Sequence, residues 1–170
     1  MQDTCIVTGG AGFIGCALSG SLVSRFGRVV AIDNMHQQVH RAPLRPKALH
    51  PKVHFVLDDV TTPSTWDKLL CNWHPHTIIH LAAETGTGQS LTEARRHAFV
   101  NVVGTSTMLD ALVRNQAIPK HIMLTSSRAV YGEGYWLDMD GKRIAPGTRG
   151  FDQLAAKVWN FPGLTYTPSS

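Results

Sequence analysis

Short apolar runs alternate with amphipathic stretches along the first three quarters of the chain. Runs of about four to eight apolar, largely β-branched residues are typical of buried strands. Such runs lie at residues 4–8, 29–33, 53–57, 76–83 and 121–127. Helical spacing of apolar residues predicts helices at residues 13–26, 62–73 and 91–115. The last helix is long, and we expect it to bend, or to be two helices that meet, near Gly104.

The alternation of strands and helices predicts an α/β fold. Several strand runs are apolar on both faces, which is typical of parallel strands covered by helices on each side of the sheet. After Gly132 this pattern ends, and residues 133–170 are rich in glycine and proline. Only residues 151–159 show a helical pattern there. We therefore expect residues 133–170 to form an irregular insertion or tail, not a further strand–helix unit.

A glycine-rich turn, TGGAGFIG, connects the first strand to the first helix. The spacing of Gly9, Gly12 and Gly15 permits a sharp turn, the approach of a pyrophosphate to backbone N–H groups, and close packing of the helix on the strand. Asp33 ends the second strand, where an acid can hydrogen-bond the ribose hydroxyls of an adenosine. A carboxylate there repels a 2′-phosphate, so we expect NAD as the cofactor. Arg41 and its basic neighbours leave NADP open as the alternative.

Composition and charge exclude few classes of function. The chain has 170 residues, of which 43% are hydrophobic, and a net charge of +4, which is ordinary for one globular domain. Residues 34–57 contain Lys and Arg but no acid, and we interpret them as a solvated loop beside a basic edge in preference to a phosphate or nucleic-acid contact. No apolar stretch is long enough to span a membrane. We therefore expect neither a nucleic acid nor a membrane as a partner.

The cysteines and histidines give no metal or disulfide pattern. Cys5, Cys16 and Cys71 form neither a Cys-x-x-Cys pair nor an even set. The N-terminus lacks a secretory leader pattern, so we expect a reduced, cytoplasmic protein. No residues have the spacing of metal ligands, and no metal is expected. His80 lies in an apolar strand run, where a histidine is more often a core residue with satisfied hydrogen bonds than a ligand.

Five short motifs follow one another between residues 4 and 134: VTGGAGFIG, LDDV, HLAAETG, NVVGT and SSRAVYG. In this order they resemble the extended short-chain dehydrogenase/reductase family, the nucleotide-sugar epimerases and dehydratases. The resemblance implies a Rossmann-type doubly wound parallel sheet with strand order 3-2-1-4-5 and an incomplete C-terminal part. It further implies an NAD-binding domain over residues 1–132 and a nucleotide-sugar substrate.

The resemblance also implies roles for individual residues. Asp59 would contact the adenine, Asn101 would lie near the nicotinamide half, and Ser127 would be the catalytic, substrate-binding hydroxyl. Simpler roles stay open, since Asp59 could cap a turn, Asn101 could bond within its helix and Ser127 could end a strand. The cofactor-binding residues implied are Gly9, Gly12, Phe13, Ile14, Gly15, Asp33, Asn34, Asp59, Val60, Leu81, Ala82, Ala83 and Asn101.

One part of the family pattern is missing from this chain. In the family a Tyr-x-x-x-Lys pair follows the serine, and the lysine lowers the pKa of the phenol so that tyrosinate can take the proton of a sugar hydroxyl. None of Tyr131, Tyr135 and Tyr166 has a lysine four residues on. The pair either lies beyond residue 170, which we favour, or has been lost. In both cases we expect the chain to be the front half of an enzyme and inactive alone.

The residues around Ser127 favour one reaction of the family over another. Dehydratases of the family usually carry Thr-Asp-Glu where this chain has Ser127, Arg128 and Ala129, and elimination needs an acid there. We therefore expect epimerisation at the sugar C4, for the biosynthesis of polysaccharide. The alternative is a non-catalytic dinucleotide-binding protein or a truncated relic. A missing helix would leave an apolar face exposed, so oligomerisation, for example as a homodimer, is expected.

Overall fold

A computed structural model describes residues 3–86 and 88–167, with only the backbone described at Arg128. The chain divides into two compact units, Met1–Thr125 and Ser126–Ser170. The composition of the sequence changes slightly later, at Gly132. Within the described residues, no helix has both the length and the apolar character needed to cross a bilayer.

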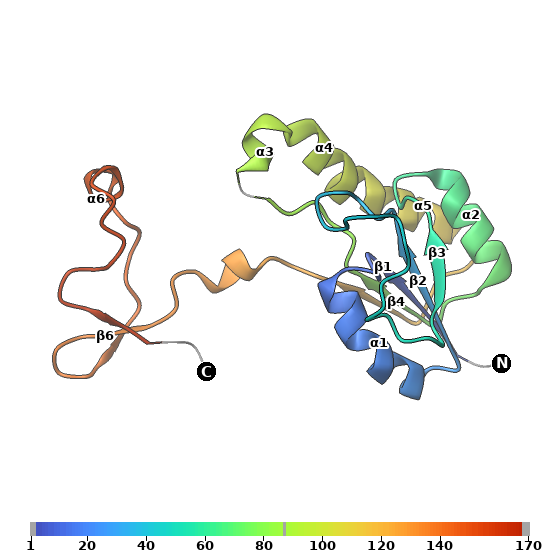
Figure 1. Ribbon diagram of the computed structural model, residues 1–170, viewed down its shortest axis with the longest axis horizontal. Helices are drawn as coiled ribbons and strands as arrows, with labels where there is room; N and C mark the ends of the chain where they lie inside the picture. Colours follow the sequence, from blue (N-terminus) through green and yellow to red (C-terminus); the bar gives the residue numbers. More distant parts are fainter. Residues whose placement is uncertain (1–2, 87, 168–170) are drawn as a thin grey trace. The chain divides into compact units, whose positions relative to one another are not determined.

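The first unit contains a five-stranded parallel sheet in the order β3-β2-β1-β4-β5 (Figure 1). This confirms the α/β, Rossmann-type prediction and its strand order. Strand β1 is central, and its Ile6 pairs with Val30 of β2 on one side and with Ile78 of β4 on the other. The strands are β1 (Thr4–Thr8), β2 (Arg28–Asp33), β3 (His54–Leu57), β4 (Thr77–His80) and β5 (His121–Leu124).

Apolar residues on the two faces of the sheet form two separate cores. Because side chains alternate along a strand, Ile6 points to one face of β1 while Cys5 and Val7 point to the other. Helix α1 (Phe13–Arg25) covers the Cys5 face, and α2 (Pro63–Asn72) and α5 (Thr105–Arg114) cover the Ile6 face (Figure 1). The α2 residue Trp66 is fully buried, and its indole N–H donates to the Val60 carbonyl at 2.9 Å. The fold is therefore doubly wound, as predicted.

Two strands are shorter than the apolar runs predicted. The fourth strand ends at His80 instead of residue 83, because its neighbour β1 ends at Thr8, where the glycine turn begins. The fifth ends at Leu124 instead of residue 127, because β4 no longer offers a partner beyond His80. The residues after His80 are apolar for another reason, since they line a pocket.

The helix predicted over residues 91–115 is broken into four segments. These are α3 (Gln89–Thr92), α4 (Ala94–Ala98), a π-helix η1 (Phe99–Gly104) and α5. The predicted junction near Gly104 is confirmed, since the π-helix gives way to α5 there. Gly104 is buried, and an added Cβ would lie 3.3 Å from Val60 Cγ2, so the helix passes close to the chain after β3. The break between α3 and α4 was not predicted.

The second unit contains a small antiparallel sheet, in the order β7-β6-β8, that the sequence did not suggest. Trp136 is buried in β6, and its indole ring lies edge-on to the rings of Phe161 and Tyr166. The helix predicted over 151–159 ends at Ala155, because Lys157 adopts a left-handed backbone conformation with φ 56°. The elements are η2, a 3₁₀ turn (Arg128–Tyr131), β6 (Trp136–Leu137), β7 (Arg143–Ile144), α6 (Phe151–Ala155) and β8 (Thr165–Tyr166).

Candidate functional site

The glycine turn between β1 and α1 has no room for a Cβ at Gly9, Gly10 or Gly15. Gly9 has a φ of +62°, and a Cβ there would lie 2.8 Å from the Ala82 backbone nitrogen. A Cβ at Gly15 would lie 2.4 Å from the carbonyl oxygen of Gly10. The turn therefore packs backbone against backbone. Helix α1 begins directly after Gly12, and its first N–H groups receive no side-chain cap, which leaves the positive end of the helix able to hold an anion.

Asp33, at the end of β2, is attached to this turn. Its Oδ2 accepts a hydrogen bond from the Ala11 N–H at 3.1 Å, and its Oδ1 accepts one from the Met35 N–H at 2.9 Å. His40 Nε2 lies 3.7 Å from Oδ1. A carboxylate has about four lone-pair sites, so Asp33 can accept further hydrogen bonds on its pocket side.

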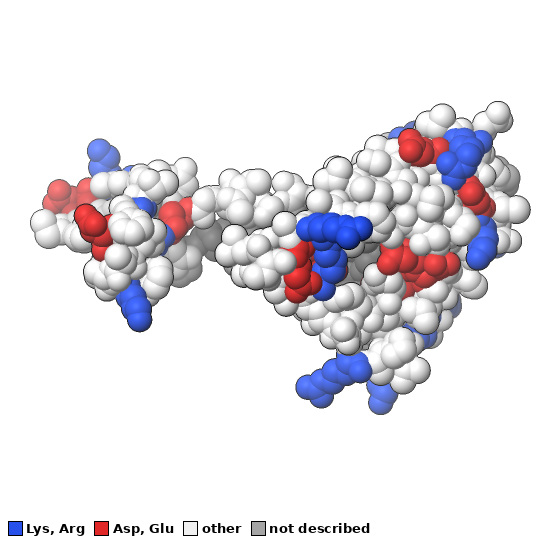
Figure 2. All heavy atoms as spheres, turned by 90° about the horizontal axis from the view of Figure 1, so that it is seen from above, with Lys and Arg blue, Asp and Glu red and all other residues white. Residues whose placement is uncertain are grey.

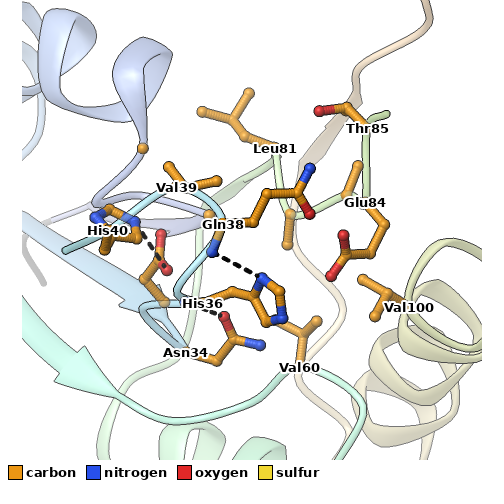
Figure 3. Close-up of a pocket in the computed structure, with 15 residues that line it drawn as sticks. Asn34, His36, Gln38, Val39, His40, Val60, Leu81, Glu84, Thr85 and Val100 are labelled. Carbon is orange, nitrogen blue, oxygen red and sulfur yellow. Dashed lines mark hydrogen bonds and ion pairs between the residues drawn. The ribbon is translucent and has the colours of Figure 1, made fainter. Parts of the chain in front are cut away.

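A pocket opens at the carboxyl ends of β1, β2 and β4 (Figure 3). One wall is the loop after β2, with Asn34 through His40, and the opposite wall is the segment after β4. The pocket brings together eight of the residues that the sequence indicated: Gly9, Gly12, Asp33, Asn34, Val60, Leu81, Ala82 and Ala83. Open parallel sheets bind ligands at this edge, where the strand order reverses, here between β1 and β4.

Other indicated residues lie outside the pocket lining. Phe13 is 89% exposed and Ile14 is also exposed on the first turn of α1, whereas Gly15 packs against Gly10. Asp59 Oδ1 accepts hydrogen bonds from the N–H and hydroxyl of Thr61, so it caps a turn.

The second oxygen of Asp59 holds a pocket residue. Asp59 Oδ2 accepts a hydrogen bond from Asn34 Nδ2 at 2.9 Å. Burial alone would raise the pKa of the Asp59 carboxyl, but the hydrogen bonds from Asn34 and Thr61 outweigh it and lower that pKa. Asp59 thus fixes Asn34 at the pocket wall, and contact with an adenine stays a prediction.

Asn101 binds the backbone of the segment after β4. Its Oδ1 accepts from the Glu84 N–H at 2.7 Å, and its Nδ2 donates to the Glu84 carbonyl at 3.1 Å. The π-helical turn presents Asn101 to this segment. The side chain shapes the pocket wall by holding the backbone of Glu84, and its contact with a nicotinamide stays a prediction.

Seven further residues line the pocket: His36, Gln38, Val39, His40, Glu84, Thr85 and Val100. Glu84 and Thr85 lie within the HLAAETG motif but were not indicated as site residues, and the other five lie outside the five motifs. Figure 3 shows the Gln38 side chain directed toward Glu84 and the Val39 side chain beside Leu81. Arg96 joins the two walls, since it donates to Gln38 Oε1 at 3.1 Å and pairs with the Glu84 carboxylate at 3.3 Å. For the residues outside the motifs, the only signal in the sequence is their place in a loop after a strand, since loops at the carboxyl ends of parallel strands face the ligand.

Ser127 belongs to the second unit. Its Oγ accepts a hydrogen bond from the Ala129 N–H at 3.1 Å and so caps the 3₁₀ turn η2. This local role does not test a catalytic one, which stays a prediction.

The basic segment between β2 and β3 uses part of its charge internally. The Arg45 guanidinium donates to the carbonyls of Val53 at 3.0 Å and His50 at 2.7 Å, and so holds the loop together. On the face that Figure 2 shows, basic and acidic side chains of the first unit are interspersed. No group of three or more His, Cys, Asp or Glu in the described part of the chain is arranged to hold a metal ion.

The pocket suits a dinucleotide. The uncapped start of α1 offers N–H groups to a pyrophosphate, Asp33 offers acceptors to ribose hydroxyls, and Val60 and Leu81 offer apolar walls to ring systems. Gly9, Gly10 and Gly12 of the turn have no side chain that would keep a phosphate from the backbone. These residues could therefore hold NAD in the orientation that the strand ends dictate.

Comparison with known proteins agrees with this geometry. The model of the family described as GDP-mannose 4,6 dehydratase matches residues 6–136. A curated protein of Burkholderia thailandensis, dTDP-L-rhamnose 4-epimerase, is 58% identical over 164 residues, which cover 96% of this chain and 45% of that protein.

Two solved structures share the fold. UDP-glucose 4-epimerase of Thermotoga maritima, crystallised with UDP-glucose, matches with a TM-score of 0.66 at 24% identity, over 77% of this chain and 40% of that one. UDP-glucose 4-epimerase of Brucella ovis, in complex with NAD, matches with a TM-score of 0.63 at 28% identity, over 76% of this chain and 37% of that one. The present chain spans less than half the length of each of these proteins.

Proposed function

This chain belongs to the GDP-mannose 4,6-dehydratase family, and from that membership we propose that it is the NAD-binding part of a nucleotide-sugar 4-epimerase. We assign the NAD-binding domain to residues 1–132. The observation that carries the proposal is the pocket in which the glycine turn, Asp33 and the segment after β4 meet. The match to an epimerase at 58% identity supports the reaction.

NAD is the cofactor that fits this pocket. The Asp33 carboxylate favours ribose hydroxyls over a 2′-phosphate by charge, and the related structure from Brucella ovis was solved with NAD. When bound, NAD would take a hydride from the sugar C4 and return it. In this chain, the N–H groups at the start of α1 would hold the pyrophosphate and Asp33 would orient the adenosine ribose. Ser127 would hydrogen-bond the reacting oxygen of the sugar.

A dTDP-linked sugar is the substrate class that we propose. The family match ends at residue 136, but the identity with the dTDP-L-rhamnose 4-epimerase continues over 96% of the chain and so includes most of the second unit. The UDP-glucose 4-epimerases of Thermotoga maritima and Brucella ovis are 24% and 28% identical to the chain, against 58% for the dTDP-L-rhamnose 4-epimerase. Sequence identity with the dTDP-L-rhamnose 4-epimerase beyond the cofactor domain supports a shared class of substrate. A role in the biosynthesis of polysaccharide would follow from such a substrate.

We propose that the 170-residue chain binds NAD but does not epimerise a sugar by itself. The supporting observation is that none of its three tyrosines is followed four residues on by lysine. The same observation favours the second candidate, a non-catalytic dinucleotide-binding protein.

Calorimetric titration with NAD⁺ and an epimerase assay on dTDP-L-rhamnose test these proposals together. Binding without turnover is the expected result. Absence of NAD binding would overturn the cofactor assignment, and turnover by this chain alone would overturn the claim that it lacks the base. Adding the remaining part of a related epimerase separates the two candidates, since only the enzyme fragment would gain activity.

Self-association, as a homodimer, is a further part of the proposal. Large apolar side chains are exposed on η1, α5 and β5 of the first unit, and exposed apolar patches commonly mark protein contacts. They include Phe99, Val102, Leu109, Val113, Ile122, Met123 and Leu124. Sedimentation velocity tests this, because a monodisperse, cooperatively melting monomer would contradict it.

We place the protein in the cytoplasm. The three cysteines are free thiols in the structure, which suits a reducing compartment. Fractionation of cells with an antibody against the chain would test the location, and recovery outside the cytoplasm would contradict it.

A further inference from the structure

The imidazole of His80 is buried between two threonine hydroxyls. The residue lies at the end of β4 and is only 3% exposed. Its Nδ1 lies 2.7 Å from Thr8 Oγ1 on β1, and its Nε2 lies 3.0 Å from Thr105 Oγ1 on α5. The expectation of a core histidine with satisfied hydrogen bonds is therefore confirmed. The roles proposed above for the start of α1, Asp33 and Ser127 do not involve His80.

The neighbouring hydrogen bonds determine which nitrogen of His80 carries the proton. Thr105 has one hydroxyl hydrogen and donates it to the Asn101 carbonyl at 2.8 Å. Its oxygen must therefore accept from His80, so the hydrogen of a neutral imidazole is on Nε2. Nδ1 then has a lone pair and accepts from the Thr8 hydroxyl. The Thr8 oxygen in turn accepts from the Ala82 N–H at 3.1 Å.

These bonds form a closed path, which we call the His80 circuit. It runs from the Ala82 N–H through Thr8, His80 and Thr105 to the Asn101 carbonyl. The Asn101 side chain returns the path to the pocket wall, because it is bonded to both the N–H and the carbonyl of Glu84. Ala82 and Glu84 both line the pocket. The two ends of one pocket wall are thus held through a single imidazole.

We propose that His80, as the neutral Nε2–H tautomer, is a positioning residue that holds the wall formed by residues 82–84 in the place needed to bind NAD. The inference rests on the proposed function, since it assumes that NAD is the ligand. His80 acts through Thr8 and Thr105 and touches no reacting atom. His80 contributes to NAD binding because the circuit holds the backbone of residues 82–84 in place before NAD binds, so less conformational entropy is lost on binding.

A second proton on His80 would leave one donor of the circuit without a partner. With hydrogens on both nitrogens, the Thr8 oxygen would accept from both the Ala82 N–H and Nδ1–H, and the Thr8 hydroxyl would lose Nδ1 as its acceptor. The groups that face the imidazole, Thr8 from β1 and Thr105 from α5, carry no charge that could stabilise an imidazolium. Burial also lowers the pKa of His80, which supports the neutral form.

The tautomer can be measured on the wild-type chain without any ligand. Long-range ¹H–¹⁵N correlation spectra distinguish a protonated Nε2 from a protonated Nδ1. We expect an Nε2–H, neutral His80 at neutral pH. An Nδ1–H tautomer or an imidazolium would overturn the circuit, whether or not the chain binds NAD, so this result is independent of the proposed function.

The positioning role is tested by titration of the 170-residue chain with NAD⁺. We expect His80→Phe and Thr105→Val to bind NAD⁺ about tenfold more weakly. Each substitution leaves a buried hydrogen-bonding group without its partner, so residues 82–84 are held less firmly. His80→Gln keeps a side-chain amide that can donate to Thr105, and should recover part of the loss. Ser106→Ala is the matched control, since it removes a hydroxyl-to-carbonyl bond of the same kind on α5, 2.9 Å long, outside the circuit.

Melting temperatures separate positioning from loss of the fold. If His80→Phe does not fold, Thr105→Val and His80→Gln still decide the question, since both preserve most of the side-chain volume. Wild-type affinity in Thr105→Val, or an equal loss in Ser106→Ala, would overturn the positioning role. Absence of NAD binding by the wild type would instead overturn the proposed function, and the role with it.

Discussion

The backbone N–H of Ala11 donates a hydrogen bond to the Asp33 carboxylate at 3.1 Å, which joins the glycine turn to the end of β2. The glycine turn and the Asp33 carboxylate, for which we propose contacts with a pyrophosphate and a ribose, are therefore one connected structure. Met35 N–H donates to the other oxygen of the same carboxylate. A change at Asp33 is thus expected to affect both the ligand and the loop that surrounds it.

Replacing Asp33 with Ala should weaken NAD⁺ binding by roughly tenfold to a hundredfold, since hydrogen bonds to a charged group are lost. Asp33→Asn retains one oxygen acceptor and should lose less. Calorimetric titration measures both. Asp110→Ala, which removes an exposed acid from α5, is the control for the change in net charge. Unchanged affinity in Asp33→Ala would remove the ribose assignment.

Replacing Gly9 with Ala should destabilise the chain by more than about 1 kcal/mol, because Gly9 has a positive φ and an added Cβ would meet the Ala82 backbone at 2.8 Å. Gly20→Ala is the matched control. Gly20 lies in α1 with nothing within 4 Å of an added Cβ, so alanine there should stabilise the helix by about 0.5–1 kcal/mol. Urea unfolding measures both changes. Equal effects would contradict the close approach of Gly9, in the glycine turn, to the Ala82 backbone after β4.

The stability of the chain should fall at mildly acidic pH because of His80. Burial lowers the pKa of His80 from its ordinary value of 6.5, so the unfolded chain takes up a proton that the folded chain does not. The free energy of unfolding is not affected by this group above pH 6.5, where His80 is neutral in both states. It decreases as the pH falls from 6.5 toward the lower pKa of His80 in the folded chain, by at most about 1.4 kcal/mol per pH unit. Urea unfolding across this range should show a smaller dependence in His80→Gln, and equal slopes would contradict the prediction.

The cysteines should differ in reactivity toward iodoacetamide. Burial raises the pKa of the Cys5 thiol to about 12, so it has almost no thiolate and no solvent access in the folded chain, whereas Cys71 is exposed. Peptide mass spectrometry after timed labelling should find Cys71 modified first and Cys5 only after unfolding. Labelling of Cys5 at the rate of Cys71 in the native chain would show that the sheet opens.

The sheet could be predicted because its central strands are buried on both faces. Every residue of β1 and β4 is buried, so neither strand shows the polar–apolar alternation of a half-exposed strand, and each has an apolar, β-branched centre. The ends of the strands could not be predicted in the same way. Leu81, Ala82 and Ala83 are as apolar as the strand before them, but they line a pocket instead of pairing with a neighbour.

The pocket residues that could be predicted are those that a turn, a strand end or a motif indicates, such as Leu81 to Ala83 in HLAAETG. Gly9 and Asp33 follow from the turn and the strand end. The loop residues His36 and Gln38 follow no such rule, because their place depends on Arg96, which lies far along the chain and contacts both side chains. The sequence indicated Asp59 as an adenine contact, with a turn cap as the alternative. The carboxylate does cap the turn, and the adenine contact stays a prediction. Its bond to Asn34 could not be predicted, because Asn34 lies outside the LDDV motif.

The strand order has a consequence for how the chain is made. Strand β1 is synthesised first and lies in the centre of the sheet, with β2 on one side and β4 on the other. Strands β1, β2 and β3 can pair as soon as residue 57 has left the ribosome, but the other edge of β1 has no partner until residues 77–80 emerge. During that interval one edge of β1 is unpaired and apolar, and an open edge of this kind makes a nascent chain prone to aggregation.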